Sequence, residues 1–106
     1  MALINLSELK TKELIKGFDA RFIHTENLTL GYVTIKSGSV LPPHSHANEQ
    51  VTHVLEGKLE MNIGGVTQIA EHGKVAVIPS GVVHSAKALS DCQVLDVFYP
   101  VREDYK

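Results

Sequence analysis

Short runs in which apolar and polar residues alternate follow one another along most of the chain. Residues 59–63, for example, read LEMNI, and every second residue of this run is apolar. Because successive side chains of a strand point to opposite faces, such alternation predicts a strand with one buried face. The same kind of run predicts strands at residues 28–36, 51–55, 59–63, 66–70, 75–78, 82–86 and 92–99.

Glycine and proline separate these runs. Gly64-Gly65 lies between two of them and predicts a two-residue hairpin, because both positions tolerate positive φ angles. Short strands at roughly ten-residue spacing, divided by such turns, indicate an all-β sandwich or barrel. The evidence for helix is thin: Ser7 could cap, and Gly17 could end, a short helix over residues 7–16.

The composition limits the function classes. The chain has 106 residues, of which 43% are hydrophobic and 21% charged, and this fits one folded domain over residues 1–106. A formal net charge of -2 and a sequence pI near 6.3 provide no basic field that would attract nucleic acid or an acidic membrane surface. We therefore expect neither nucleic acid nor membrane among its partners.

The remaining sequence-wide features favour a cytoplasmic protein. The N-terminus has neither the basic start nor the apolar run of a signal peptide, and no stretch approaches the roughly 18 apolar residues of a membrane span. The single cysteine, Cys92, cannot form an intrachain disulfide, and we interpret it as a free buried thiol.

Histidines gather in the stretch PPHSHANEQ, residues 42–50. His44 and His46 share a face if the backbone is extended, and the two preceding prolines stiffen the approach and exclude a fully paired central strand. Gln50 can face back toward this pair, and His84 follows a Pro-x-Gly turn further along the chain. Because imidazole is the commonest ligand of transition metals, these residues predict a site of three histidines and one oxygen donor.

The other three histidines are interpreted as unrelated to this site. His72 lies in a Glu-His-Gly turn and is expected in solvent, and His24 ends a strand-like run and is expected to be exposed. His53 is an odd number of residues from Gln50 along one strand and should point to the opposite face.

Two segments resemble the two motifs of the cupin superfamily. GSVLPPHSHANEQVTHVLEG, residues 38–57, matches the spacing of the first motif, and GKVAVIPSGVVH, residues 73–84, matches the second. The asparagine that follows the second motif in the family is absent, and Ala88 stands there. The resemblance covers a core of about residues 28–100 and implies a double-stranded β-helix, or jelly-roll barrel, with one divalent transition metal inside. The ligand set suits nickel, zinc, manganese or iron.

Position 50 departs from the family pattern, which usually has glutamate there. Gln50 is in register with that position, whereas Glu49 is one residue early and would face away. Gln50 is therefore the expected fourth ligand, and Glu49 is the alternative. Three neutral imidazoles and a neutral amide would leave the metal's +2 charge uncompensated, which favours polarising a carbonyl or hydroxyl group over activating oxygen.

The C-terminal run CQVLDVFYPVREDY, residues 92–105, places Asp96 on one strand face with Phe98 and other apolar residues. A carboxylate in such surroundings is costly unless it is paired or functional. Arg102 could form a structural ion pair with Asp96, or it could hold a substrate carboxylate through two parallel hydrogen bonds.

This tail also resembles that of small cupins from pectin and alginate breakdown, which open 4,5-unsaturated monouronates to linear keto acids. The resemblance implies active-site roles for Asp96, Phe98 and Arg102, although Tyr99 stands where that group often has serine. It implies a metal held by His44, His46, Gln50 and His84. Because small cupins resemble one another in pairing through β-strands, it also implies a homodimer.

Three functions remain open at this stage. The favoured one is a metal-dependent enzyme for a small anionic sugar acid, in which Asp96 moves a proton during an enol-to-keto conversion. The second is a non-catalytic cupin that binds or senses a metal or a small ligand. The third is a metal-dependent dioxygenase, whose activity would require iron and oxygen.

Overall fold

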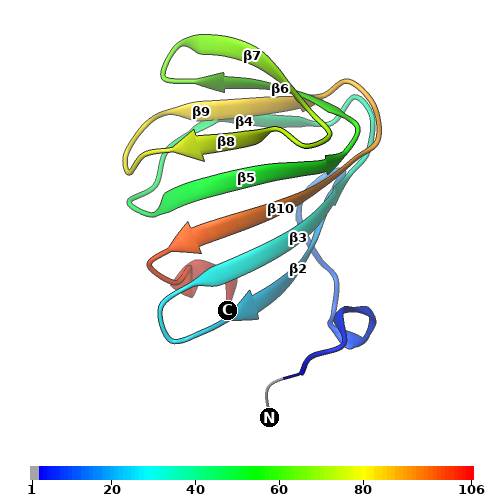
Figure 1. Cartoon of the computed structure of the whole chain (residues 1–106), viewed down its shortest axis with the longest axis vertical. Coiled ribbons are helices and arrows are strands. Elements are labelled where there is room, and N and C mark those ends of the chain that lie inside the picture. Colours follow the sequence, from blue (N-terminus) through cyan, green and yellow to red (C-terminus); the bar gives the residue numbers. More distant parts are fainter. Residues whose placement is uncertain (1–2) are drawn as a thin grey trace.

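The computed structural model describes residues 3–106, in which the regular secondary structure is almost entirely β-strand (Figure 1). Within these residues the elements follow one another as η1 (Leu6–Glu8), β1 (Lys12–Ile15), β2 (Phe18–His24), β3 (Thr29–Ile35), β4 (Val40–His44), β5 (Glu49–Glu56), β6 (Lys58–Ile63), β7 (Val66–Glu71), β8 (Val75–Ile78), β9 (His84–Ala88), β10 (Cys92–Tyr99) and η2 (Glu103–Tyr105).

The strands form two antiparallel sheets. The larger sheet has the order β1-β2-β3-β10-β5-β8, and the smaller has the order β4-β9-β6-β7. Alternate residues of each strand point inward, so that Val33 and Ile35 of β3 meet Leu59 and Met61 of β6 in one buried cluster. This arrangement confirms the all-β jelly-roll barrel that the sequence predicts.

The sole cysteine is part of this core. Cys92 begins β10 and is completely buried, and its Sγ lies 3.2 Å from the carbonyl oxygen of Lys58. Burial in apolar surroundings raises the pKa of the Cys92 thiol. The residue is therefore the free buried thiol that the sequence analysis expects.

The N-terminal third contains strands that the alternation pattern does not reveal. Residues 7–16 form no α-helix: a 3₁₀ turn capped by Asn5 ends at Glu8, and β1 follows it. Gly17, which would suit a helix end, instead turns the chain from β1 into β2 with a φ of 88°. The reason is that β1 finds a partner in β2, and this pairing outweighs the weak local helix signals.

Strand β4 contains both prolines of the histidine-rich stretch. It is an edge strand of the smaller sheet, and its pairing with β9 is irregular between Leu41 and His44, where Pro42 and Pro43 lie. Proline is tolerated at such positions because an edge strand leaves N–H groups unpaired on one side. The expectation that this segment is not a central strand is confirmed.

Among residues 3–106, no helix is long and apolar enough to cross a membrane.

Candidate metal centre and active site

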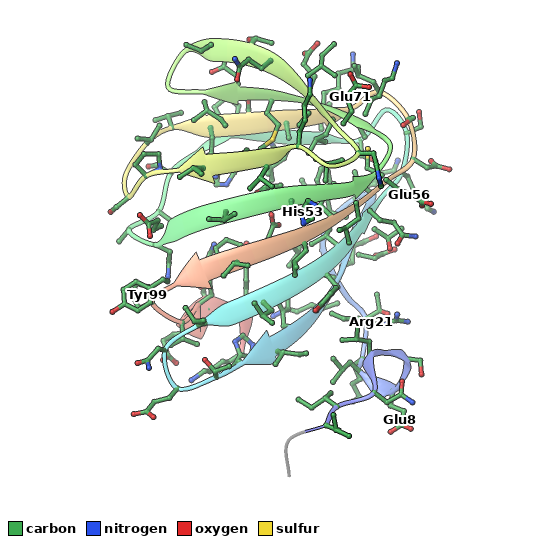
Figure 2. All side chains as sticks on the ribbon, viewed as in Figure 1. Glu8, Arg21, His53, Glu56, Glu71 and Tyr99 are labelled. Atoms are coloured by element: carbon green, nitrogen blue, oxygen red, sulfur yellow. The ribbon has the colours of Figure 1, made fainter. Side chains whose placement is uncertain are left out.

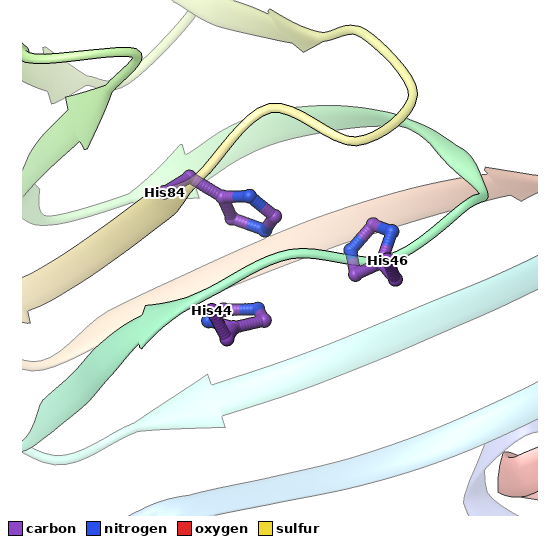
Figure 3. Close-up of side chains that lie close together, drawn as sticks. All are labelled: His44, His46 and His84. Carbon is purple, nitrogen blue, oxygen red and sulfur yellow. The ribbon is translucent and has the colours of Figure 1, made fainter.

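Three histidines lie side by side inside the barrel (Figure 3). His44 ends β4, His84 begins β9, and the two residues are direct partners in the antiparallel register. His46 follows two residues after His44, just before the bend that leads to β5. The possible ligand atoms of the three side chains all lie within 4.8 Å of one another.

Each imidazole ring is oriented by a backbone carbonyl. In all three histidines, Nδ1 lies 2.9 Å from a carbonyl oxygen of a residue two positions away. These carbonyls belong to Pro42, Asn48 and Val82. Because a carbonyl oxygen can only accept, each Nδ1 donates its proton, and each Nε2 keeps a free lone pair.

Two of these lone pairs have no hydrogen-bond donor to accept from among residues 3–106. Nε2 of His84 is buried and has no hydrogen-bond partner among the described residues. Nε2 of His46 lies 3.0 Å from Oε1 of Gln50, so that two acceptor atoms face each other. Two acceptors at this distance repel unless a cation lies near both of them. The donor set therefore fits a transition metal, which prefers imidazole nitrogen and accepts an amide oxygen.

Gln50 is held in the orientation that such a metal would need. Its side-chain Nε2 donates to Oγ1 of Thr52 at 2.9 Å and to Oδ1 of Asp96 at 3.3 Å. The opposite amide orientation would place Oε1 against the carboxylate, so Oε1 faces the histidines instead. Gln50 is only 8% exposed, whereas Glu49 points out of the barrel into solvent.

Asp96 lies on β10 directly opposite Thr52 of β5. The Thr52 hydroxyl donates to Oδ1 of Asp96 at 2.6 Å, which completes a triangle of hydrogen bonds with Gln50. Burial raises the pKa of Asp96 to about 6, while the hydrogen bonds from Thr52 and Gln50 and the charge of Arg102 oppose the rise. A carboxyl group with a pKa close to neutrality can both accept and donate a proton under physiological conditions.

Arg102 is paired with Asp104 rather than with Asp96. Its Nε and Nη2 donate to the two carboxylate oxygens of Asp104 at 2.9 and 2.7 Å. Its guanidinium carbon lies 3.9 Å from the centre of the Tyr105 ring and 4.8 Å from that of Phe98. The structural ion pair between Asp96 and Arg102 that the sequence allowed is therefore not formed.

The C-terminal tail is fastened to the barrel by its backbone and by an aromatic contact. The backbone N–H of Arg102 donates to Oγ1 of Thr29 at 2.8 Å, and the Asn48 side chain donates to the carbonyl of Pro100 at 2.6 Å. Tyr105 stacks on Phe22 with ring centres 4.7 Å apart. The tail thus holds Arg102 beside the histidine site.

The electrostatic surroundings favour neutral histidines. Burial lowers the pKa of His46, and the nearby charge of Arg102 lowers it further. Burial likewise lowers the pKa of His84, with smaller contributions from His44 and His46. Since only the neutral imidazole binds a metal, these effects prepare the site for one.

One cavity with a volume of about 190 Å³ is lined by His44, Gln50, Thr52, His84, Asp96, Phe98, Arg102 and Tyr105, whereas His46 and Asp104 are not part of its lining. The cavity has a polar part, formed by His44, His84, Gln50, Asp96 and Arg102. The rest of the lining is largely apolar and includes Leu14, Phe18, Phe22, Leu41 and Met61. It therefore suits a small molecule with its polar groups gathered on one side.

Three residues of this site escaped the sequence analysis. Thr52 is two residues from Gln50 on the same strand face, so alternation could have identified it. Asp104 and Tyr105 reach the site because they lie in the 3₁₀ turn η2, and no sequence pattern predicted this turn.

The remaining histidines lie outside the site. His53 points to the outer face of β5 and His72 is exposed in its turn, as expected. The expectation that His24 is exposed was wrong. It is half-buried because its Nδ1 lies 2.9 Å from Oγ1 of Thr29 and its ring stacks on Phe22.

The barrel and its cluster of three histidines define the class of protein. A family model described as a cupin domain matches residues 31–98, and the chain belongs to the cupin family. Among individual proteins, it is similar to the pectin degradation protein KdgF of Dickeya dadantii, with 28% identity over 101 residues and 92% coverage of both chains. An uncharacterized protein of Streptomyces coelicolor is also 28% identical, over 102 residues, covering 94% of this chain and 97% of that one.

A comparison with solved structures also finds a KdgF protein. KdgF from Halomonas sp. superposes with a TM-score of 0.93 at 28% sequence identity, covering 100% of this chain and 99% of that chain. The agreement extends over the full barrel and its tail, so this chain is a small cupin similar to KdgF.

Proposed function

We propose that this protein is a metal-dependent enzyme that converts unsaturated monouronates of pectin or alginate breakdown into linear keto acids. The observation that carries the proposal is the meeting of two features in one cavity. Nε2 of His46 lies 3.0 Å from Gln50 Oε1, and Nε2 of His84 is buried without a hydrogen-bond partner among the described residues. The same Gln50 contacts Asp96, a carboxyl group whose pKa is raised to about 6. The similarity to KdgF proteins supports this choice of substrate.

His44, His46, His84 and Gln50 would hold one divalent transition metal in this proposal. When bound, the metal would supply Lewis-acid polarisation of a substrate oxygen atom. The protein itself orients the side chains that would bind the metal. Backbone carbonyls fix the orientation of the three imidazole rings, and hydrogen bonds to Thr52 and Asp96 fix that of the Gln50 amide.

Asp96 would move the proton. Opening the ring of a 4,5-unsaturated uronate breaks the bond between the anomeric carbon and the ring oxygen. The anomeric hydroxyl loses its proton to become an aldehyde, and the ring oxygen takes up a proton to become an enol. The resulting enol becomes a ketone when carbon 4 gains a proton and the former ring oxygen loses one. The reaction is an isomerisation without net proton uptake, so one carboxyl group that accepts and then donates is sufficient.

Arg102 and Phe98 would position the substrate. The Asp104 carboxylate occupies Nε and one hydrogen of Nη2 of Arg102, which leaves Nη1 and the second hydrogen of Nη2 as donors for a substrate carboxylate. Phe98 is 4% exposed, lies beside His46 with ring centres 5.8 Å apart, and lines the cavity. It would therefore pack against one side of the substrate.

The experiment measures the loss of ultraviolet absorbance of the conjugated double bond of an unsaturated monouronate. The protein would be freed of metal, reloaded separately with nickel, zinc, manganese or iron, and compared with the His44→Ala/His46→Ala variant. We expect turnover above the spontaneous rate with at least one metal and none with the variant. Metal binding without turnover would leave a binding or sensing cupin, and oxygen consumption with iron alone would indicate a dioxygenase.

A further inference from the structure

The strand registers place most polar groups of the cavity at one level of the barrel. In the larger sheet, Thr52 of β5 is opposite Asp96 of β10, and Gln50 is two residues from Thr52 on the same strand face. In the smaller sheet, His44 of β4 is opposite His84 of β9. The next inward positions lie two residues further along each strand, in the direction that leads away from this polar level.

The cavity continues beyond the polar level, and its lining changes character there. The lining residues one and two such steps further are apolar. They include Val33, Ile35 and Val94 on the larger sheet and Leu41, Met61 and Ala86 on the smaller. A sugar hydroxyl placed among these side chains would lose its hydrogen bonds to water without gaining a partner. The sugar acid of the proposed function therefore uses the polar level and leaves this apolar part without a ligand group.

Three apolar side chains of the lining are only partly buried: Leu14 of β1, Phe22 of β2 and Leu41 of β4. We call these three side chains the apolar wall. Figure 2 shows Arg21, the strand neighbour of Phe22, on the outer side of the larger sheet, so that Phe22 points to the cavity side. The apolar wall can thus contact a ligand without any opening of the fully buried core.

Gly31 allows the Phe22 ring to take this place. The two residues are direct partners in the register of β2 and β3. A Cβ atom at position 31 would lie 3.0 Å from Cε1 of Phe22 and 3.8 Å from Cβ of Asp96. Because glycine has no side chain, the ring can lie across β3 beside the polar level.

Tyr105 connects the apolar wall to a cation. Its ring stacks on that of Phe22 with centres 4.7 Å apart, and the guanidinium carbon of Arg102 lies 3.9 Å from its centre. One aromatic ring therefore separates Arg102 from the wall. Arg102 keeps Nη1 and one hydrogen of Nη2 as donors beside its pairing with Asp104. A carboxylate that binds these donors can place an apolar group, one or two atoms away, against the wall.

We propose that this cavity has a second class of ligand besides sugar acids, namely small monocarboxylic acids with an apolar body. The carboxylate pairs with Arg102, and the body packs against Leu14, Phe22 and Leu41. Binding of this class needs neither turnover nor a bound metal, so it is independent of the proposed function.

The volume of the cavity limits the size of the acid. The cavity measures about 190 Å³. An apolar protein cavity of roughly 150 Å³ accepts benzene. The space therefore suits one aromatic ring with a short carboxylate arm, and it does not hold such an acid together with a sugar. In an active preparation, phenylacetate should raise KM for an unsaturated monouronate and leave kcat unchanged.

The first test is a ligand series on the wild-type protein, measured by calorimetry in metal-loaded and in chelator-treated samples. Phenylacetate carries both groups, acetate lacks the apolar body, and 2-phenylethanol lacks the charge. We expect phenylacetate to bind at least about tenfold more tightly than either of the others, because it alone uses Arg102 and the apolar wall together. Equal affinity for acetate or for 2-phenylethanol would overturn the proposal, and so would the loss of phenylacetate binding after chelation.

The second test locates the apolar body with two matched variants on β4. Leu41→Asn changes the apolar wall, whereas Val40→Asn changes its outward neighbour, which is 52% exposed. Leu41→Asn should weaken phenylacetate binding roughly tenfold and leave acetate binding unchanged, because only the apolar contact is reduced. Val40→Asn should change neither affinity. The same loss in both variants, or in neither, would contradict the placement. If Leu41→Asn does not fold, the ligand series on the wild type decides the question alone.

Discussion

Replacing Asp96 by asparagine separates the proton-transfer role that we propose for this side chain from its structural role. The substitution preserves the shape of the side chain, and the remaining Oδ1 can still accept the hydrogen bonds from Thr52 and Gln50. What is lost is the ability to accept a proton. Since a general acid or base contributes about 10²- to 10⁴-fold in rate, kcat should fall on that scale while the bound metal is unchanged.

The same substitution should alter the stability of the metal-free protein in a pH-dependent way. A folded-state pKa raised from 3.8 to about 6 corresponds to a cost of about 3 kcal/mol for the ionised carboxylate. Because the folded-state pKa is raised, the stabilising effect of the neutral form is complete below about pH 4 and is lost as the pH rises through about 6. Asp96→Asn has no such loss and should be more stable than the wild type at pH 7.

The assay combines three measurements on the wild type and the variant. These are turnover of an unsaturated monouronate, metal content after purification, and urea unfolding of chelator-treated protein at pH 4 and pH 7. A variant that turns over at near-normal rate but unfolds more easily at pH 7 would refute the reasoning, because Asp96 would then be a structural anion.

Further predictions concern the metal, the tail and the amide. The His44→Ala/His46→Ala variant should lose stoichiometric metal, as elemental analysis would show, and a retained full equivalent would contradict the assignment. Asp104→Asn should raise KM roughly tenfold with little change in kcat, because it loosens the guanidinium group that the carboxylate orients; its unfolding free energy should change by less than about 1 kcal/mol, since the Asp104 side chain is 62% exposed. Equal losses in kcat and stability would instead indicate a folding defect. Gln50→Glu would place a second carboxylate beside Asp96, so calorimetry should show tighter metal binding and the activity assay slower turnover; unchanged affinity would argue against Gln50 as a ligand.

The barrel and the histidine cluster were predictable from the sequence because both depend on local spacing. Strands β5 and β6 alternate clearly, and His44 and His46 share a face through the two-residue period of an extended chain. Gln50 could be placed in the cavity, and Glu49 outside it, by the same rule.

The parts that could not be predicted depend on contacts between distant segments. Strand β4 carries two prolines and shows no alternation, and it forms a strand only because β9 lies beside it. The partner of Arg102 was also not determined by sequence. Asp96 and Asp104 are both within reach along the chain, and the 3₁₀ turn of η2 brings Asp104 to the guanidinium group.

The interior of the barrel explains how the proposed metal ligands and the proposed proton-transfer group can lie so close together. Along β5 and β10, successive inward pairs are Val54 with Val94, then Thr52 with Asp96. Both valines belong to the apolar core, although Val94 also borders the cavity, and the next inward pair supplies polar groups to the cavity. Apolar packing therefore gives way to polar groups within two residues along each strand. Buried polar groups are stable only when they are satisfied, and Thr52 and Asp96 satisfy each other and the amide of Gln50. The hydrogen bonds that keep these polar groups stable inside the barrel are therefore the same ones that aim Gln50 at the histidines.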